Sequence, residues 1–307
     1  AIGIVAHEIV DSFKNKSVSL EDYISCIKIY IFENAPTFMS NRGTELRKHF
    51  EEIAMELGYS VLYYKTDTNL HHNCQFRPRT FVIFFKHTED EPQRPFMFDW
   101  EDSRMTVDEF FEKIDNDNLT QNEPVQSSPH NYMVIDFIKY KYGDNWKDYV
   151  AGSLMDHCIN NNLLDELILF IKNDYVNATE ETKEKAIKYI EHIRYKKSIG
   201  LNYFGDDVCL CKKRFLSVQF KTIPNMLHPS GERICSCREY LSLMGMPFDF
   251  TLYGGKNCLN KIGQNVPVET ARFIVEQAIK KLEIWDKPRE NDKNFTYQDN
   301  TKQKVIY

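Results

Sequence analysis

The pattern of apolar and polar positions in the first hundred residues predicts alternating helices and strands. Residues 1–28 have the periodicity of a helix, and the apolar run IYIF at 29–32 predicts a short strand that ends at polar residues. Apolar residues at helical spacing predict a helix over 44–57, stopped by a glycine. Further apolar runs predict strands at 60–65 and 80–86. This alternation is typical of an α/β layer structure, in which we expect the first strand to be buried and parallel.

The pattern changes near Glu101, where we expect a domain boundary. The polar, proline-containing segment 115–130 is typical of a linker or long loop, and residues 131–200 have helical periodicity throughout. A last helix is predicted at 268–282, followed by a polar tail with little apolar content. The predicted parts of the chain are residues 1–100, 101–227, 228–283 and 284–307.

Composition narrows the class of protein. A chain of 307 residues with 42% hydrophobic and 27% charged side chains forms one large or two modest packed domains, and is neither disordered nor fibrous. The sequence contains no apolar run of about 18 residues and no signal-peptide pattern, so we expect a soluble cytoplasmic protein that does not enter a membrane. The eight cysteines lie at irregular positions, which is typical of reduced thiols.

The net charge of −6 means that any surface for nucleic acid must be a local patch. Residues 194–221 contain seven Lys or Arg and two Asp, with aromatic residues between them. This segment is the best candidate for phosphate contacts, although an ordinary basic surface has the same composition. The charged face of the helix predicted before it needs no role beyond solvation. The candidate DNA-binding residues of the segment are Lys196, Lys197, Lys212, Lys213 and Arg214.

Two groups of polar residues lie at the ends of predicted strands. Glu33 follows the first strand, where a carboxyl group partly removed from water can donate a hydrogen bond to a ring nitrogen. Gln75, Arg77 and Arg79 alternate just before the strand at 80–86, so they share one side of an extended segment. Their forked donors suit a carbonyl, carboxylate or phosphate group. Each group also has an explanation without a function. Glu33 could simply cap the next turn, and the triplet could form an ion-pair network between strands.

Two later segments contain polar residues where a helix is expected to begin. Residues 228–250 contain Ser236 shortly before Arg238 and Glu239, a pattern that predicts a helix start with internal pairing. Residues 260–273 form an amide-rich loop that enters the last helix, and such a loop can bind a polar ligand through side-chain amides and backbone donors.

In their order along the chain, these four segments resemble motifs of the DNA cytosine-5 methyltransferase family. FENAP resembles the Glu-Asn-Val motif of the family, and QFRPR resembles its Gln-x-Arg-x-Arg motif. HPSGERICSCREY with GMPFDF resembles the Arg-x-x-Thr-x-Arg-Glu motif, and KIGQNVP resembles the final cofactor motif. The resemblance covers residues 29–101 and 228–282, and the variable stretch between them corresponds to the target-recognition domain of the family.

The resemblance implies an α/β, Rossmann-like methyltransferase domain that lacks its N-terminal strands and carries an inserted, mainly helical recognition domain. Residues 1–100 would be the second half of the catalytic domain, 101–227 the recognition domain, and 228–283 its base and the returning helix. The implied reaction transfers a methyl group from S-adenosylmethionine to a cytosine that is flipped out of duplex DNA, after a cysteine thiolate adds to ring carbon 6. The implied setting is a bacterial or phage-infected cell.

Roles for individual residues follow from the motifs. Glu33 would contact cytosine at N3 and the exocyclic amine, and Arg79, supported by Arg77, would hold the carbonyl oxygen. Arg238 and its neighbour Glu239 would brace the recognition domain. The further residues that the resemblance places at DNA are Gln75 and Arg238, and those that it places at the cofactor are Asn260, Gln264 and Asn265.

The sequence also departs from the family in two motifs that carry chemistry. It contains no Gly-x-Gly cofactor loop, and none of its 11 prolines is followed by the nucleophilic cysteine. In the third motif Ser236 replaces threonine, and the final motif has Gly263-Gln264-Asn265 where Gly-Asn-Ser or Gly-Asn-Ala is usual. A partner subunit could supply the missing motifs, or polypeptide that precedes this sequence could do so. Alternatively, the chain is a noncatalytic DNA-binding or regulatory homologue, or a module for another polar substrate.

The cysteines offer two further hypotheses. Cys209 with Cys211, and Cys235 with Cys237, form two Cys-x-Cys pairs, but zinc sites usually use Cys-x-x-Cys, so we expect no metal. Cys74 lies beside the Gln-x-Arg-x-Arg segment and could be a displaced nucleophile activated by positive charge, but a half-buried structural thiol is the simpler expectation.

Overall fold

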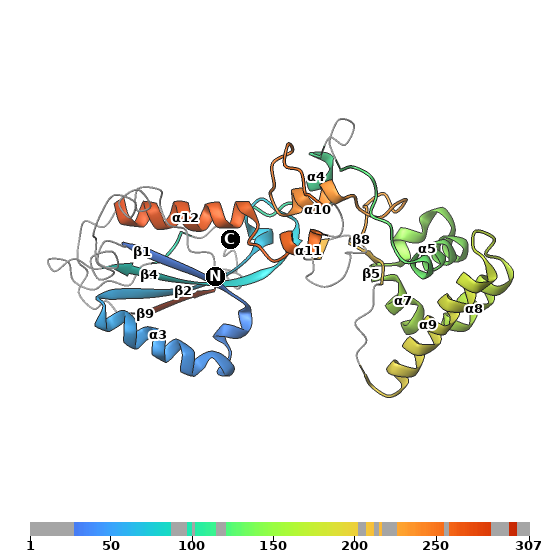
Figure 1. The fold of residues 1–307 in the computed structure, drawn as a ribbon, viewed down its shortest axis with the longest axis horizontal. Helices are drawn as coiled ribbons and strands as arrows, with labels where there is room; N and C mark the ends of the chain where they lie inside the picture. The colour runs from blue at the N-terminus through green and yellow to red at the C-terminus, as the bar shows by residue number, and fades with distance from the viewer. Residues whose placement is uncertain are drawn as a thin grey trace. The chain divides into compact units, whose positions relative to one another are not determined.

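The chain forms two compact units in the computed structural model (Figure 1). Unit 1 comprises Ala1–Arg104 and Val268–Tyr307, and unit 2 comprises Met105–Pro267. The helix expected over residues 1–28 lies outside the described residues apart from Lys28. The structure describes residues 28–86, 97–99, 102–114, 121–201, 207–211, 215–216, 226–254, 258–283 and 295–299.

Unit 1 is built on a four-stranded mixed sheet in the order β1-β4-β2-β9. The central strand β4 is antiparallel to both β1 and β2, whereas β9 is parallel to β2. The apolar runs predicted as strands are confirmed. No strand was predicted in the polar tail after the last helix, but residues 295–299 of this tail form β9. The strands are β1 (Ile29–Asn34), β2 (Tyr59–Asp67), β4 (Pro78–Lys86) and β9 (Phe295–Asp299).

The prediction that the first strand is buried and parallel is wrong. In the described sheet β1 lies at the edge and pairs only with β4, in antiparallel orientation. Its side chains are half-buried or exposed, whereas those of β2 and β4 are mostly buried. A short apolar run such as IYIF suits an edge strand packed on one face as well as a buried parallel strand, so the pattern alone could not separate the two.

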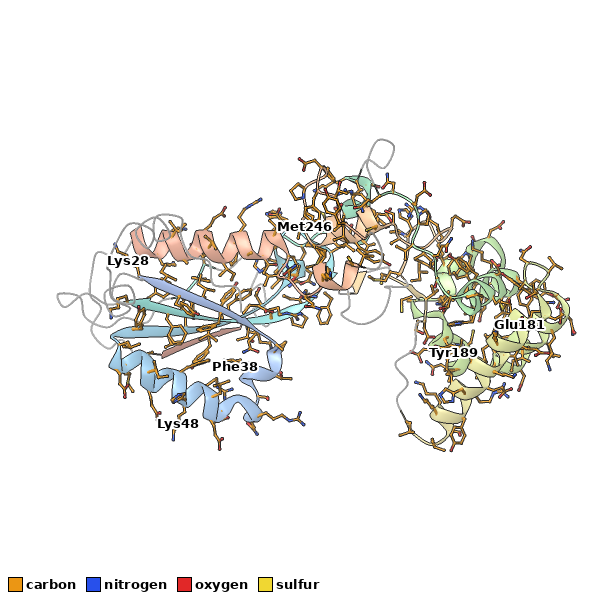
Figure 2. The ribbon with its side chains drawn as sticks, viewed as in Figure 1. Lys28, Phe38, Lys48, Glu181, Tyr189 and Met246 are labelled. Atoms are coloured by element: carbon orange, nitrogen blue, oxygen red, sulfur yellow. The ribbon has the colours of Figure 1, made fainter. Side chains whose placement is uncertain are left out.

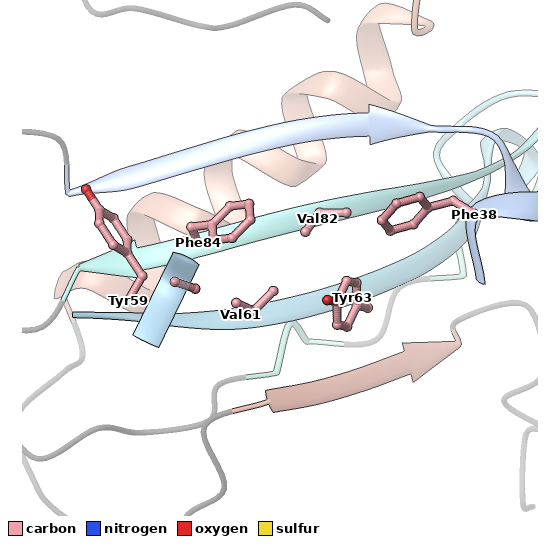
Figure 3. Close-up of a cluster of buried hydrophobic side chains, with 7 residues drawn as sticks. Phe38, Tyr59, Val61, Tyr63, Val82 and Phe84 are labelled. Atoms are coloured by element: carbon pink, nitrogen blue, oxygen red, sulfur yellow. The ribbon is translucent and has the colours of Figure 1, made fainter. Parts of the chain in front are cut away.

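Helix α3 (Thr44–Glu56) covers one face of the sheet (Figure 1). Alternate side chains of β2 and β4, including Val61 and Val82, pack there in a buried cluster with Phe38 and Ala54 (Figure 3). The helix ends where predicted, because Gly58 adopts a φ of 72° just beyond its C-cap. Its outer face is polar, and Lys48 points away from the sheet (Figure 2).

The apolar side chains of α3 are only partly covered. Leu46, Ile53 and Leu57 are 38–46% exposed, while Phe50 packs on Phe32 of β1 with ring centroids 5.7 Å apart. We call these four residues of the helix and its C-cap, Leu46, Phe50, Ile53 and Leu57, the α3 stripe. Phe50 thus joins the stripe to the edge strand, and the other three residues leave a half-exposed apolar surface.

Helix α12 (Val268–Glu283) covers the opposite face of the sheet (Figure 1). The ring of Tyr64 contacts Phe98 and Phe273, with centroid distances of 5.1 and 6.2 Å. The side chains of Phe273 and Ile274 are buried, as the sequence predicts for the last helix. The shorter elements of unit 1 are η1 (Pro36–Met39), η2 (Asn41–Gly43), η3 (Thr68–Leu70) and β3 (Gln75–Phe76).

Unit 2 is mainly helical, and the helical periodicity predicted over residues 131–200 is confirmed. Three short strands form a small sheet in which β6 is antiparallel to β5 and parallel to β8. No helix among the described residues of the chain is long and apolar enough to span a membrane. The helices are α4 (Val107–Glu112), α5 (Pro129–Tyr142), η4 (Gly143–Asn145), α6 (Trp146–Tyr149), α7 (Leu154–Asn160), α8 (Leu164–Asn173), α9 (Glu180–Ser198), α10 (Cys237–Leu243) and α11 (Leu259–Ile262). The strands are β5 (Gly152–Ser153), β6 (Cys209–Leu210), β7 (Phe215–Leu216) and β8 (Met226–Leu227).

Candidate functional site

The end of β1 and the start of β4 bring Glu33 and Arg79 together. Because the strands are antiparallel, Glu33 pairs with Phe81, and Arg79, two residues earlier on β4, projects from the same face. Arg79 Nε lies 2.6 Å from Glu33 Oε1, and the two side chains are 22% and 29% exposed. The structure therefore places an ion pair at this edge of the sheet, where a ligand from solvent can reach it.

Arg77 adds a second guanidinium behind this pair. Its side chain is buried. The pKa of Arg77 is lowered to about 10, mainly by burial and also by the nearby charge of Arg79, while the carboxylate of Glu33 opposes both effects. A group with this pKa is still charged at neutral pH, so Arg77 contributes positive charge to the environment of the pair.

The end of β2 holds the backbone of Arg77 from both sides. Asp67 Oδ1 accepts the Arg77 N–H at 2.9 Å. The Arg77 carbonyl accepts two bonds from Thr68, at 3.2 Å from Oγ1 and at 3.3 Å from the backbone N–H. Both Asp67 and Thr68 are buried. The sequence interpretation missed these residues, although a Thr-Asp-Thr segment at the end of a strand is a signal for side-chain bonds to nearby backbone.

Two residues expected to contact DNA are buried. Gln75 is fully buried, and its backbone N–H donates to Asn73 Oδ1 at 2.8 Å. Arg238 is also fully buried and donates to the carbonyls of Pro247 and Phe250 at 3.0 and 2.6 Å. In this structure neither side chain lies at the surface. Charged side chains are seldom fully buried, so nothing in the sequence pattern predicted burial of Arg238.

The predicted helix start with internal pairing is confirmed at α10. Ser236 Oγ accepts the Glu239 N–H at 3.2 Å, and Glu239 Oε2 accepts the Ser236 N–H at 2.7 Å, which forms a capping box. Arg233 binds Glu239 through two hydrogen bonds of 2.6 and 2.8 Å. Burial alone would raise the pKa of Glu239, but the bonds from Arg233 and Ser236 outweigh it and hold the pKa below its usual value.

The residues expected at the cofactor lie around the turn between α11 and α12. Gln264 is exposed and Asn265 is half-buried, with Asn265 Nδ2 donating to the Lys261 carbonyl at 3.2 Å. The side chain of Asn260 lies outside the described residues. Primary amides both donate and accept, so this donor set fits the charged amino-acid end of S-adenosylmethionine.

The basic segment is partly neutralised where the structure describes it. Arg194 pairs with Asp165 at 2.7 Å, and Lys197 pairs with Asp156 at 3.3 Å. Lys196 is half-buried near the end of α9. The charges of Arg194 and Lys197 are therefore balanced within unit 2. Lys212, Lys213 and Arg214 lie outside the described residues.

The described cysteines form no disulfide bond with one another. Cys74 is buried, which does not favour it as an exposed nucleophile. Burial raises the pKa of Cys209 to about 12, and that of Cys237 to about 11. A thiol with such a pKa stays protonated at neutral pH. Within the described ranges, no three His, Cys, Asp or Glu side chains lie close enough to hold a metal ion.

Known proteins similar to this chain are found among solved structures. A search of curated protein sequences finds no match. Among solved structures, the chain is similar to a prophage-encoded E. coli protein assigned as a DNA modification methyltransferase, with 15% identity, a TM-score of 0.45, and coverage of 91% of this chain and 84% of that chain. It is also similar to the Entamoeba histolytica methyltransferase EhMeth, with 12% identity, a TM-score of 0.43, and coverage of 83% of this chain and 63% of that chain. A third similar structure is the S. pombe Dnmt2 methyltransferase, with 11% identity, a TM-score of 0.36, and coverage of 84% of this chain and 68% of that chain.

The comparison with family models gives one match over most of the sequence. The model of the C-5 cytosine-specific DNA methylases matches residues 26–280. This range includes Glu33, the Gln-x-Arg-x-Arg segment and the loop that enters α12. The chain therefore belongs to the C-5 cytosine-specific DNA methylase family.

Proposed function

We propose that this chain is the part of a DNA cytosine-5 methyltransferase that holds the target cytosine. The observation that carries this proposal is the ion pair of Glu33 and Arg79 at the edge of the sheet, in a member of the C-5 family. Both groups are partly exposed and are oriented by each other before a base arrives. Such preorganisation reduces the cost of placing charge and hydrogen bonds around a reacting ring.

The two side chains have complementary roles in the proposed reaction. Addition of a thiolate to cytosine carbon 6 moves electron density toward N3 and the carbonyl oxygen of the ring. Arg79 uses Nε for Glu33 and Nη1 for the Pro78 carbonyl at 2.8 Å, and a guanidinium has five N–H donors in all. Further donors of the fork would hold the carbonyl oxygen, while Glu33 in its protonated form would donate a hydrogen bond to N3 and accept one from the exocyclic amine.

S-adenosylmethionine, when bound, supplies the methyl group. Gln264 and Asn265, with Asn260, would hold its amino-acid end through amide hydrogen bonds. Lys196, Lys212, Lys213 and Arg214 remain the proposed phosphate contacts, because Arg194 and Lys197 of α9 are paired with acids. These contacts would position duplex DNA without reading its sequence.

The proposed enzyme needs a nucleophile from other polypeptide. No proline in the 307 residues is followed by cysteine, and Cys74 is buried. The edge of β1 in the described sheet and the α3 stripe offer an apolar surface that a further strand and helix could cover. We propose that the polypeptide carrying the Pro-Cys motif, whether a partner subunit or a preceding part of the same protein, packs there.

A second candidate function is that of a noncatalytic DNA-binding homologue. The lack of both the Gly-x-Gly loop and the Pro-Cys motif favours it. Such a protein would bind duplex DNA with a steep dependence on salt but would transfer no methyl group under any condition.

The test is methyl transfer by a reconstituted complex. The chain is mixed with a polypeptide that carries the Gly-x-Gly loop and the Pro-Cys motif of the family, duplex DNA and methyl-labelled S-adenosylmethionine, and label in cytosine is counted. We expect labelling that Glu33→Gln lowers by about 100-fold, because Glu33 contacts the reacting ring. The matched control Glu181→Gln changes an exposed carboxylate on α9 (Figure 2) and should leave the rate unchanged.

The outcomes separate the two candidates. DNA binding without any labelling of cytosine would favour the noncatalytic homologue. Labelling that Glu33→Gln leaves at its normal rate would remove Glu33 from the mechanism.

A further inference from the structure

We infer that Asp67 and Thr68 are positioning residues that hold Arg77 and Arg79 in place for the cytosine. This inference rests on the proposed function, in which Arg79 binds the base. Neither residue belongs to the motifs that the sequence resembles, and neither needs to touch the substrate. We call the two residues the arginine clamp.

The clamp fixes a peptide unit on each side of Arg77. The carboxylate of Asp67 accepts the N–H of Arg77, and Thr68 donates to its carbonyl through both the hydroxyl and the backbone. Asp67 Oδ1 also accepts the N–H of Asn69 at 3.3 Å, which starts η3 and orients the carboxylate. With both backbone groups of Arg77 held, the direction in which the chain enters β4 is fixed.

Proline 78 explains why this point of the sheet needs side-chain support. Asp67 of β2 pairs in register with Pro78 of β4, and Thr66 pairs with Arg79. Pro78 has no N–H group, so it cannot donate a ladder hydrogen bond at the position just before Arg79. The clamp places three hydrogen bonds on the residue before the proline instead. A bond from a backbone N–H to a carboxylate is also stronger than one to a neutral acceptor.

The position of Arg79 depends on this entry into β4. Its Nε must stay within hydrogen-bond distance of Glu33, which comes from a different strand. A shift of the backbone by about 1 Å at a site of this kind can lower a reaction rate by about 100-fold. Asp67 is 4% exposed, so it influences the base through the arginines and is not itself a catalytic residue.

The experiment compares variants of the clamp in two measurements. Arg79 Nε–H is followed in ¹⁵N NMR spectra of the full chain, with the signal assigned by Arg79→Lys. The reconstituted complex gives kcat and the KM for DNA. The variants are Asp67→Ala, Asp67→Asn, Thr68→Val and Thr68→Ser. The matched control is Asp99→Ala, which removes the ion pairs with Lys280 and Lys281 in the same unit.

We expect Asp67→Ala to shift or broaden the Arg79 Nε–H signal and to lower kcat about 10- to 100-fold, with the KM for DNA changed less than about twofold. Asp67→Asn keeps an oxygen acceptor and should recover most of kcat. Thr68→Ser keeps the hydroxyl and should match the wild type, whereas Thr68→Val should lower kcat about tenfold. Asp99→Ala should lower Tm without changing the Arg79 signal or kcat.

Two results would overturn the inference. One is an unchanged Arg79 signal in Asp67→Ala. The other is a kcat of Asp67→Ala that falls no more than the kcat of Asp99→Ala when the two variants lose the same Tm. Should Asp67→Ala not fold, Asp67→Asn and Thr68→Val are judged by the same two criteria. If the wild-type complex transfers no methyl group, the proposed function fails, and the NMR measurement still decides whether the clamp positions Arg79.

Discussion

The guanidinium of Arg79 and the carboxylate of Glu33 lie 2.6 Å apart across two antiparallel strands. The pairing of β1 with β4 makes this contact, because it places the last residues of one strand beside the first residues of the other. Substitutions that change the charge or the shape of one side chain at a time can separate the contributions of Arg79 and Glu33 to methyl transfer.

Replacement of Arg79 should affect the chemical step. Arg79→Ala removes both the charge and the fork, and we expect the single-turnover rate of methyl transfer to fall about 100-fold. Arg79→Lys keeps the charge but not the paired donors, so we expect the single-turnover rate of this variant to fall about tenfold. The control Arg42→Ala changes an exposed arginine in η2. Wild-type rates in Arg79→Ala would contradict the role of the guanidinium.

The stability of unit 1 should depend on pH through His71. Burial, with a smaller effect of His72, lowers the pKa of His71 from 6.5 to about 4. Between these values the unfolded chain takes up a proton that the folded chain does not, so the free energy of unfolding falls as pH falls from 6.5 to 4. The loss is about 3 kcal/mol, and no further loss arises below pH 4.

Urea unfolding at several pH values measures this effect. His71→Gln removes the titrating group and should flatten the dependence between pH 6.5 and 4. His49→Gln changes an exposed histidine on α3 and should leave the pH dependence of the free energy of unfolding unchanged. An identical pH dependence in wild type and His71→Gln would show that His71 is not the group responsible.

The pair of the buried Glu239 and the half-buried Arg233 should stabilise unit 2. Arg233→Ala leaves a fully buried carboxylate without its strongest partner, and we expect a loss of about 3–5 kcal/mol in the free energy of unfolding. Because the pKa of Glu239 is below its usual value, its contribution is present above about pH 4.5 and is lost as pH falls below that value.

Chemical unfolding followed by circular dichroism tests the Arg233 variant. The exposed pair of Lys185 and Glu181 on α9 supplies the control, since Lys185→Ala should cost less than about 1 kcal/mol. Equal effects of the two substitutions would contradict the importance of burial.

Gly43 should be intolerant of a side chain. A Cβ atom at this position would lie 2.0 Å from the carbonyl oxygen of Phe38, so Gly43→Ala must displace the loop that follows Glu33. We expect a loss of about 3 kcal/mol in the free energy of unfolding. Gly200→Ala is the control: it meets no atom within 4 Å and adds only the strain of a φ of 72° after the end of α9, which costs about 1 kcal/mol. A smaller effect at Gly43 than at Gly200 would contradict the close approach.

Binding to DNA should depend on salt through the second half of the basic segment. Replacing Lys212, Lys213 and Arg214 by alanine should reduce the slope of log K against log salt by about 2 to 3, if each charge contacts one phosphate. Lys185→Ala, on a side chain already paired with Glu181, should leave the slope unchanged. Titrations of duplex DNA at several salt concentrations measure the slopes, and an unchanged slope in the triple variant would exclude these residues as phosphate contacts.

The sequence predicts the strands and helices better than it predicts their arrangement. Apolar runs are local and identify β1, β2 and β4, but the antiparallel position of β4 between the other two depends on pairing between distant segments. The strand Phe295–Asp299 was missed because FTYQD is half polar and lies in a polar tail. Helix α12 was predictable because its apolar side chains repeat at helical spacing and a proline precedes it.

The candidate site could be predicted in part. Family motifs identify Glu33 and the two arginines, but spacing within the sequence does not say that Glu33 and Arg79 touch. The burial of Gln75 and Arg238 could not be inferred from their types, because such side chains usually face solvent. Asp67 and Thr68 bind backbone groups of a residue ten and nine positions away. The Thr-Asp-Thr segment indicates side-chain bonds to backbone, but it does not say that their partner is Arg77.

The interruption of unit 1 by unit 2 has a consequence for synthesis of the protein. The ribosome makes β1, β2 and β4 early, but α12, whose Phe273 packs on Tyr64, emerges only after all of Met105–Pro267. At translation rates of about 5–20 residues per second, this delay is on the order of ten seconds. During that time the nascent sheet has one apolar face without its helix, so unit 2 can finish folding before unit 1, although unit 1 is begun first.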